Sequence, residues 1–175
     1  MSRRWRKRIA SALLILALLT LTGYVVSRGV VRFKAMVDHG SVGTDYIKSA
    51  YNSARQDDPA PLVRSAEEYS RLKSDLEHWS WLIAISNVLP TVSSQFRALE
   101  AIQDAGEDLV AARATRALPT GVFNDGRGSA TALCAAAKRL SGADGPLLYS
   151  QLEEVRDELL TVIGQVTSGK CGTAE

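Results

Sequence analysis

"LYSQLEEVRDELLTVIGQV", residues 148–166, is the stretch that decides the fold class. Its apolar residues alternate in steps of four and three, which is the spacing of a coiled-coil seam. The charged residues between them are on the remaining positions of the repeat. The seam consists of Leu148, Leu152, Val155, Leu159, Val162 and Val166, flanked by Glu153, Glu154, Arg156, Asp157 and Glu158. The stretch therefore predicts an amphipathic helix.

Upstream segments repeat this helical spacing. One predicted helix begins near Pro59 or Pro61, with an apolar face of Leu62, Ala66, Tyr69, Leu72, Leu76, Trp79 and Ile83. A second follows Thr91 as its N-cap and ends at Pro119, with a face of Val92, Phe96, Leu99, Ile102, Ala105, Leu109 and Ala112. A shorter helix carries Leu133, Ala137 and Leu140 and precedes a turn at residues 141–146.

The N-terminal region predicts a membrane anchor. No charged residue occurs from Ile9 to Ser27, and about 20 apolar residues are enough for a helix to cross a bilayer. A cluster of five basic residues precedes this span, whereas three follow it, so the positive-inside bias places the N-terminus in the cytoplasm and the body outside. The five are Arg3, Arg4, Arg6, Lys7 and Arg8. The alternative interpretation is a cleaved secretory signal, although no typical cleavage site follows the apolar core.

The expected fold class is all-α, with a transmembrane helix that continues into an elongated extracytoplasmic antiparallel bundle with coiled-coil-like packing. Four segments are predicted: a cytoplasmic tail (1–8), a span (9–27), a helical body (28–168) and a flexible tail (169–175). Gly40 and Gly43 are expected to weaken or interrupt the helix after the span, and "QDDPAP", residues 56–61, to reverse the chain.

An uncharged segment, "HWSWLIAISNVLP", covers residues 78–90. A helical arm from Arg28 to Gln56 would rise about 42 Å, and the return path is similar, so this segment is predicted to come back to the membrane surface. The predicted interfacial residues are Trp79, Trp81, Leu82, Ile83 and Ile85, because tryptophan suits the headgroup boundary. A buried corner between two helices is the equal alternative.

Two quoted stretches carry a resemblance to a protein family. "DLEHWSWLIAISNVLPTVSSQFRALEAIQDAGEDL", Asp75 to Leu109, and "NDGRGSATALCAAAKRL", Asn124 to Leu140, are similar to segments of actinobacterial single-pass membrane proteins that carry a domain of unknown function. Those proteins often occur beside surface-polysaccharide genes and continue into a larger folded domain. The resemblance implies a membrane anchor with a helical stalk, in a short paralogue or a truncated version.

Few residues suggest chemistry. His39 and His78 are predicted to lie on different helices, so they lack the spacing of a zinc site. The candidate ligand loop is Asp125, Gly126, Arg127 and Gly128, whose amides could face an anion, although a simple turn with Ser129 as N-cap is the favoured interpretation. Around residue 70, charged residues predict a solvated face with pairs such as Glu67 to Arg71. No enzyme, cofactor or metal site is expected.

The expected function follows from placement. Without the five N-terminal cations, 16 basic residues remain against 19 acidic ones, a net charge of −3, which disfavours nucleic acid as a partner. The sequence predicts a scaffold or interaction module of the cell envelope that contacts the lipid bilayer and a protein partner, with self-association left open. A helical sensor domain that signals through a partner membrane protein is the alternative.

Cys134 and Cys171 are expected to stay unpaired within one chain, because a level hairpin would place Cys134 opposite about residue 153.

Overall fold

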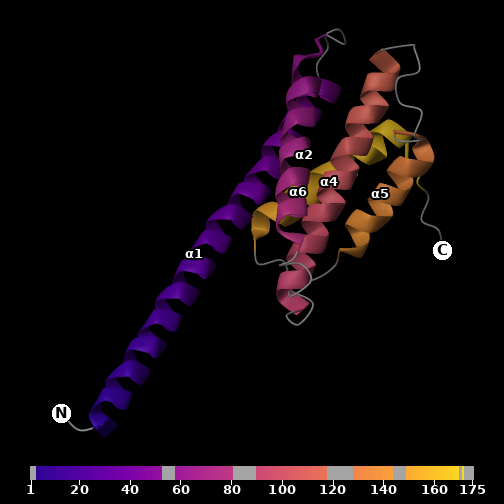
Figure 1. The fold of residues 1–175 in the computed structure, drawn as a ribbon. Coiled ribbons are helices and arrows are strands. Elements are labelled where there is room, and N and C mark those ends of the chain that lie inside the picture. Colours follow the sequence, from indigo (N-terminus) through magenta and orange to yellow (C-terminus); the bar gives the residue numbers. More distant parts are fainter. Residues whose placement is uncertain are drawn as a thin grey trace. The chain divides into compact units, whose positions relative to one another are not determined.

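The computed structural model describes residues 3–52, 58–80, 90–117, 128–143, 149–169 and 171, and every regular element in these ranges is an α-helix (Figure 1). The helices are α1 (Arg3–Asn52), α2 (Ala60–His78), α4 (Pro90–Ala117), α5 (Ala130–Gly142) and α6 (Ser150–Thr167). The all-α prediction is confirmed. The chain divides into two units, Met1–Ala35 and Met36–Glu175, and α1 contributes to both.

The first unit is the helical segment of α1 up to Ala35. Most of its described apolar side chains are exposed, among them Leu13, Leu14, Ile15, Leu16, Leu18 and Leu19, each between 54% and 65% accessible. In the described part of the chain, no helix is both long enough and apolar enough to traverse a membrane. The side chains of residues 3–12, 21–22 and 25–26 lie outside the described ones. The span from Ile9 to Ser27 therefore stays a prediction.

The second unit is built around α4, which packs against α2, α5 and α6, while α5 also packs against α6. Within this unit α4 lies between α2 and α5 (Figure 1). The predicted apolar face of α4 from Phe96 to Ala112 is buried. Small residues elsewhere on the helix, such as Ala98 and Ala111, are buried too, because neighbours cover α4 on several sides. The helix begins at Pro90, so the prediction of Thr91 as N-cap is wrong.

Helix α2 begins at Ala60 as predicted and buries Tyr69, Leu72 and Leu76. The prediction that Ala66 belongs to this buried face is wrong, since Ala66 is exposed and Ser65 is fully buried in its place. Ser65 can be buried because its Oγ donates a hydrogen bond of 3.0 Å to the carbonyl of Gly43 in α1. A hydroxyl group that is hydrogen-bonded costs little to bury. The buried face of α2 therefore includes position 65 where position 66 was predicted.

The second half of α1 runs antiparallel to α2. Ser65 lies against Gly43, and an added Cβ at Gly40 would be 3.8 Å from Leu72, so positions further along α2 meet earlier positions of α1. This confirms the predicted chain reversal before residue 61. The helix continues through Gly40 and Gly43, so the expected interruption does not occur. The two glycines instead allow α2 to approach closely.

Helices α5 and α6 follow the predicted periodicity. Leu133 and Leu140 are buried on α5, although Ala136 is buried where Ala137 was expected. On α6 the seam residues Leu152, Val155, Leu159 and Val162 are buried, together with Ile163 and Thr167. The helix ends in a left-handed cap at Ser168 (φ 54°), and Gly169 N–H donates to the carbonyl of Gly164 at 2.9 Å.

Candidate functional site

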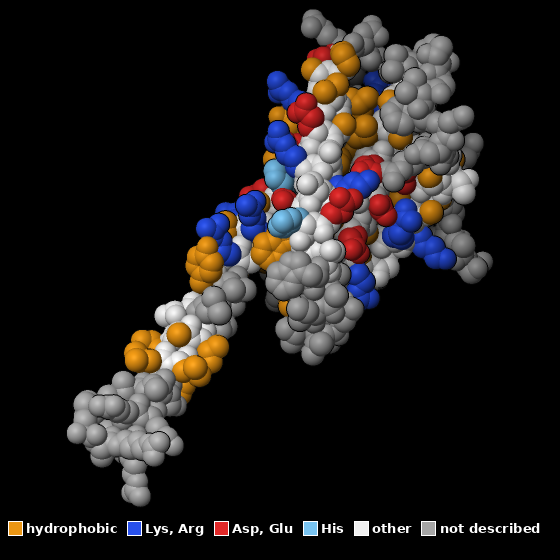
Figure 2. All heavy atoms as spheres, in the orientation of Figure 1, with side chains coloured by type: hydrophobic (Ala, Val, Ile, Leu, Met, Phe, Trp, Pro, Cys, Tyr) orange, Lys and Arg blue, Asp and Glu red, His pale blue; other side chains and the backbone are white. Residues whose placement is uncertain are grey.

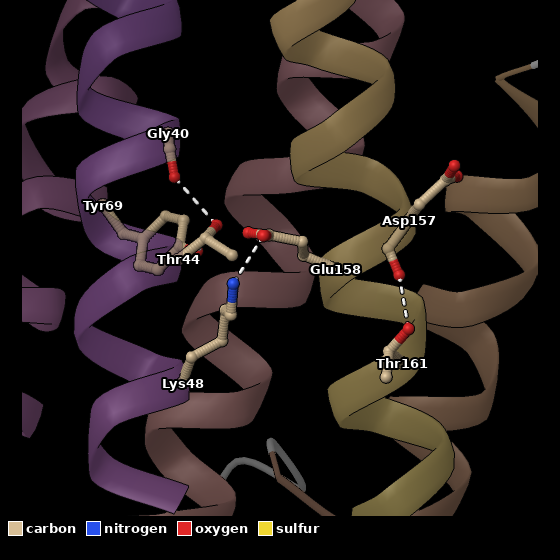
Figure 3. A network of polar contacts seen from close by, with 7 residues as sticks. All are labelled: Gly40, Thr44, Lys48, Tyr69, Asp157, Glu158 and Thr161. Carbon is tan, nitrogen blue, oxygen red and sulfur yellow. Dashed lines mark hydrogen bonds and ion pairs between the residues drawn. The ribbon is translucent and has the colours of Figure 1, made fainter. Parts of the chain in front are cut away.

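Polar side chains of α1, α2 and α6 form a network of hydrogen bonds and an ion pair (Figure 3). At its centre the Tyr69 ring is fully buried, and its hydroxyl lies 2.9 Å from Thr44 Oγ1. Thr44 in turn donates to the carbonyl of Gly40 at 2.8 Å. Because a threonine hydroxyl has one hydrogen, Tyr69 must be the donor to Thr44. The relay satisfies both buried hydroxyls.

The Tyr69 ring occupies a socket of glycines. A Cβ added at Gly43 would lie 3.1 Å from the ring, and one added at Gly106 of α4 would overlap three ring atoms. The ring therefore lies close to the backbones of α1 and α4, where Gly106 leaves no room for a Cβ and Gly43 leaves room only for a tight contact. Burial is the main cause that raises the pKa of the Tyr69 phenol far above its ordinary value. The neutral phenol acts as a hydrogen-bond donor that connects helices.

At the edge of the network Lys48 of α1 points toward Glu158 of α6, with Nζ 2.5 Å from Oε1 (Figure 3). The hydrogen bond to Glu158 is the main cause that raises the pKa of the Lys48 ammonium, and the charge of the same carboxylate adds to the effect. Both side chains are partly exposed, so solvent screens the pair. Its geometry nevertheless connects the last helix to α1.

A second polar contact joins α1 and α2. His39 Nδ1 lies 2.6 Å from Glu68 Oε2, and Arg71 donates to the other oxygen of Glu68 at 3.0 Å. The predicted pairing of Arg71 with Glu67 is therefore replaced by an i,i+3 pair with Glu68. His39 and His78 lie on different helices, as predicted, and only His78 is exposed. Glu68 carries both contacts because it faces α1.

Acidic residues on α4 form a separate stripe. Arg139 of α5 lies 3.8 Å from Asp104 and 4.0 Å from Asp108. Partial burial, and secondarily the charge of Asp104, raise the pKa of the Glu100 carboxyl. In the ranges that the structure describes, no group of three His, Cys, Asp or Glu side chains is placed to hold a metal ion.

The candidate ligand loop lies mostly outside the described residues, which include none of Asp125, Gly126 and Arg127. Gly128 is described, with φ +74°, and an added Cβ would overlap the backbone of Ala112 in α4. Ser129 caps α5 by accepting a 3.1 Å hydrogen bond from Ala132 N–H, which confirms the predicted N-cap, whereas the turn before it stays a prediction. Gly128 is thus explained by close packing on α4.

The predicted membrane-interface and topology residues are only partly described. Trp79 is half-buried and follows the end of α2, where its N–H donates to the carbonyl of Asp75 at 3.0 Å. Trp81, Leu82, Ile83 and Ile85 lie outside the described residues. The N-terminal cations begin α1, and their side chains also lie outside the described ones: Arg3, Arg4, Arg6, Lys7 and Arg8. The interfacial role of the tryptophans stays a prediction.

The prediction that Cys134 and Cys171 do not pair within one chain is wrong. The two residues form a disulfide with a Cα–Cα distance of 5.1 Å. The prediction assumed a hairpin whose helix ends are level, but residues 143–149 separate the ends of α5 and α6, and seven residues can span about 23 Å. The left-handed conformations of Ser168 and Gly169 then change the direction of the chain after α6. The tail is therefore covalently joined to α5.

Sequence reasoning missed the Tyr69 socket and the polar network. The available signal was the set of glycines inside otherwise regular helices, since such a glycine commonly marks a close backbone approach. Gly43 and Gly106 are the two that contact the Tyr69 ring. Their shared partner is 26 and 37 positions away along the chain, and no spacing rule connects them.

Comparison with known proteins adds no relationship: no protein-family model matches this chain, and no curated protein or solved structure shows significant similarity to it.

Proposed function

We propose that this chain is a membrane-anchored helical interaction module of the cell envelope, with its N-terminus in the cytoplasm and its helical body outside. The observation that carries the proposal is the row of large apolar side chains on α1 in the first unit. Six of these, between Leu13 and Leu19, are each more than half exposed. Because they occupy nearly consecutive positions, they project from all sides of the helix.

Exposing this row to water would be costly. Complete burial of one large apolar side chain stabilises a protein by about 1.5–3 kcal/mol, so six of them represent on the order of 10 kcal/mol. Lipid removes that cost without requiring a protein partner on every side. The uncharged run from Ile9 to Ser27 has the composition of a helix in lipid.

The disulfide supports the proposed orientation independently of the charge bias. Disulfides persist in oxidising compartments and are rare in the cytosol. Cys134 and Cys171 are paired in the second unit, so that unit is suited to the outside of the cell. The excess of cations before Ile9 favours the same orientation.

Interaction is favoured over catalysis because the polar groups at the centre of the second unit are used to hold helices together. Tyr69, Thr44 and Ser65 are buried, and each hydroxyl is hydrogen-bonded to another helix or to its own. A rigid helical body outside a membrane is suited to presenting a surface to a partner. The family resemblance extends this proposal to surface-polysaccharide assembly, and a sensor acting through a partner membrane protein is the second candidate.

Labelling of intact cells tests the anchor and the orientation. Variants Ser2→Cys and Ser141→Cys are treated with a membrane-impermeant maleimide, with the wild-type chain as the control because its two cysteines are bridged. We expect labelling at position 141 and none at position 2, in a protein that alkaline carbonate does not extract. The opposite pattern would show that the orientation is wrong. A mature chain lacking about 27 residues would identify a cleaved signal peptide instead.

Deletion of the gene separates the two functional candidates. A scaffold linked to polysaccharide assembly predicts a changed amount or length of surface polysaccharide. A sensor predicts unchanged polysaccharide and a changed transcriptional response to envelope stress.

A further inference from the structure

A group of exposed cations follows the apolar row of α1. Arg28, Arg32 and Lys34 are exposed, and Figure 2 shows Lys and Arg side chains on this helix beyond the hydrophobic ones. In the described part of the chain, none of the ion pairs involves any of the three. We call these three residues the collar.

The charge of the collar is uncompensated along the helix. The sequence has no Asp or Glu before Asp38, so the first 37 residues carry cations alone. Val30 and Val31 lie among the three cations and are 52% and 67% exposed. Exposed apolar and cationic groups therefore alternate over a short length, as they do on segments located at a membrane surface.

The collar cations project in different directions. Arg28 and Arg32 are four residues apart and lie on the same side of the helix. Lys34 is two residues after Arg32, so at about 100° per residue it projects from a side roughly 160° away. A protein partner would contact one side of the helix, whereas a layer of headgroups surrounds it. The arrangement therefore fits a lipid surface better than a single docked protein.

The position of the collar along α1 is also compatible with the headgroup layer of a membrane. Arg28, Arg32 and Lys34 lie about 3 Å, 9 Å and 12 Å beyond Val26 along the helix axis. The headgroup layer on each side of a bilayer is roughly 5–8 Å thick, so Arg28 lies within it, and the long side chains of Arg32 and Lys34 can extend back to it from just outside. Tyr24 lies just before the collar, and the Arg28 guanidinium carbon is 5.4 Å from the centre of its ring. A tyrosine at this depth is typical of the aromatic belt. The ring contact leaves the in-plane N–H groups of Arg28 able to donate to a phosphate.

We infer that the collar of Arg28, Arg32 and Lys34 binds the phosphate groups of anionic phospholipids in the outer leaflet, with Tyr24 orienting Arg28. This inference rests on the proposed membrane anchor and names its lipid partner. Arginine binds phosphate through two parallel N–H groups, and lysine contributes a point charge. The collar would set the depth of the anchor on the outer side.

Photo-crosslinking in vesicles tests the inference on the full chain. The vesicles consist of phosphatidylcholine. Each sample also contains a small amount of one photoreactive probe, either phosphatidylglycerol or phosphatidylcholine, with the photoreactive group on its headgroup. Mass spectrometry then identifies the labelled residues. In the wild type we expect the phosphatidylglycerol probe to label residues 24–38 at least fivefold more than the phosphatidylcholine probe does. Each basic residue near a membrane surface strengthens binding to anionic lipid about fivefold. The triple variant Arg28→Gln/Arg32→Gln/Lys34→Gln should therefore lose the preference, so that the two lipids label residues 24–38 about equally.

A matched variant removes three exposed cations elsewhere: Arg64→Gln/Lys73→Gln/Lys138→Gln. It has the same net charge as the collar variant and should keep wild-type labelling of residues 24–38. Loss of labelling in this control would overturn the inference, because it would show a general charge effect. Labelling of the N-terminal cations provides an internal reference in every sample.

A separate arm distinguishes this inference from the proposed anchor. A phosphatidylcholine with a photoreactive acyl chain should label residues 13–19 in the wild type and in both variants. If the two headgroup probes labelled residues 24–38 of the wild type equally while acyl-chain labelling was retained, the collar would be overturned as a phosphate site and the anchor would remain in place. Absence of acyl-chain labelling would overturn the anchor itself and the inference with it.

Discussion

Gly106→Ala should destabilise the protein although alanine is the better helix former. The added Cβ would overlap three atoms of the Tyr69 ring. The ring has little room to move, because an added Cβ at Gly43 would lie only 3.1 Å from it and because its hydroxyl is bonded to Thr44. The substitution therefore places an extra methyl group in a socket that is already full.

The magnitude combines two opposing effects. Replacing a helical glycine with alanine contributes about 1 kcal/mol of stability from helix propensity. Overpacking of a rigid core costs about 1–3 kcal/mol, and the clash with a confined ring belongs at the upper end. We expect a net loss of about 2 kcal/mol in the free energy of unfolding. The matched variant Gly164→Ala should instead stabilise by up to about 1 kcal/mol, because nothing lies within 4 Å of its added Cβ.

Urea unfolding of the full chain in detergent, followed by far-ultraviolet circular dichroism, measures both variants. The ring is tested by repeating Gly106→Ala in a Tyr69→Leu background, where the smaller side chain leaves space and the penalty should disappear. A Gly106→Ala protein as stable as the wild type would refute the socket. A penalty of the same size in the Tyr69→Leu background would show that Tyr69 is not its cause.

Two further predictions concern the disulfide and the α4 carboxylates. Cys171→Ser should lower the free energy of unfolding by about 4 kcal/mol, since the bridge closes a loop with a sequence separation of 37, and non-reducing peptide mapping should find the Cys134–Cys171 link only in the wild type. Unchanged stability, or a link between two chains, would contradict the intrachain bridge. For Glu100, the raised pKa means that the folded state disfavours the ionised carboxylate, so the penalty is present at neutral pH and disappears as the pH falls through the folded pKa. Glu100→Gln should therefore be more stable than the wild type at pH 7 and equal to it at pH 3, whereas a stabilisation that does not depend on pH would exclude the charge as its cause.

Local periodicity was enough to predict the helices and much of the core. The steps of four and three in residues 148–166 identify α6, and the same spacing finds the buried face of α4 from Phe96 to Ala112. These predictions succeed because a helix places residues three and four apart on one side, and this geometry is independent of the rest of the fold. The Ser129 cap is local for the same reason, since its partner Ala132 is three residues away.

Tertiary contacts decided what spacing could not. Ser65 replaces Ala66 in the buried face because the carbonyl of Gly43 accepts its hydrogen bond. Cys171 pairs with Cys134, a contact that the assumption of a level hairpin had excluded. Likewise, Gly43 was expected only to weaken its helix, whereas Gly43 and Gly106 both lie against the Tyr69 ring. Each outcome depends on two segments that are distant in sequence, and their relative position is set by the packing of whole helices. A pattern read along one segment contains no information about that position, so these features could be found only in the folded chain.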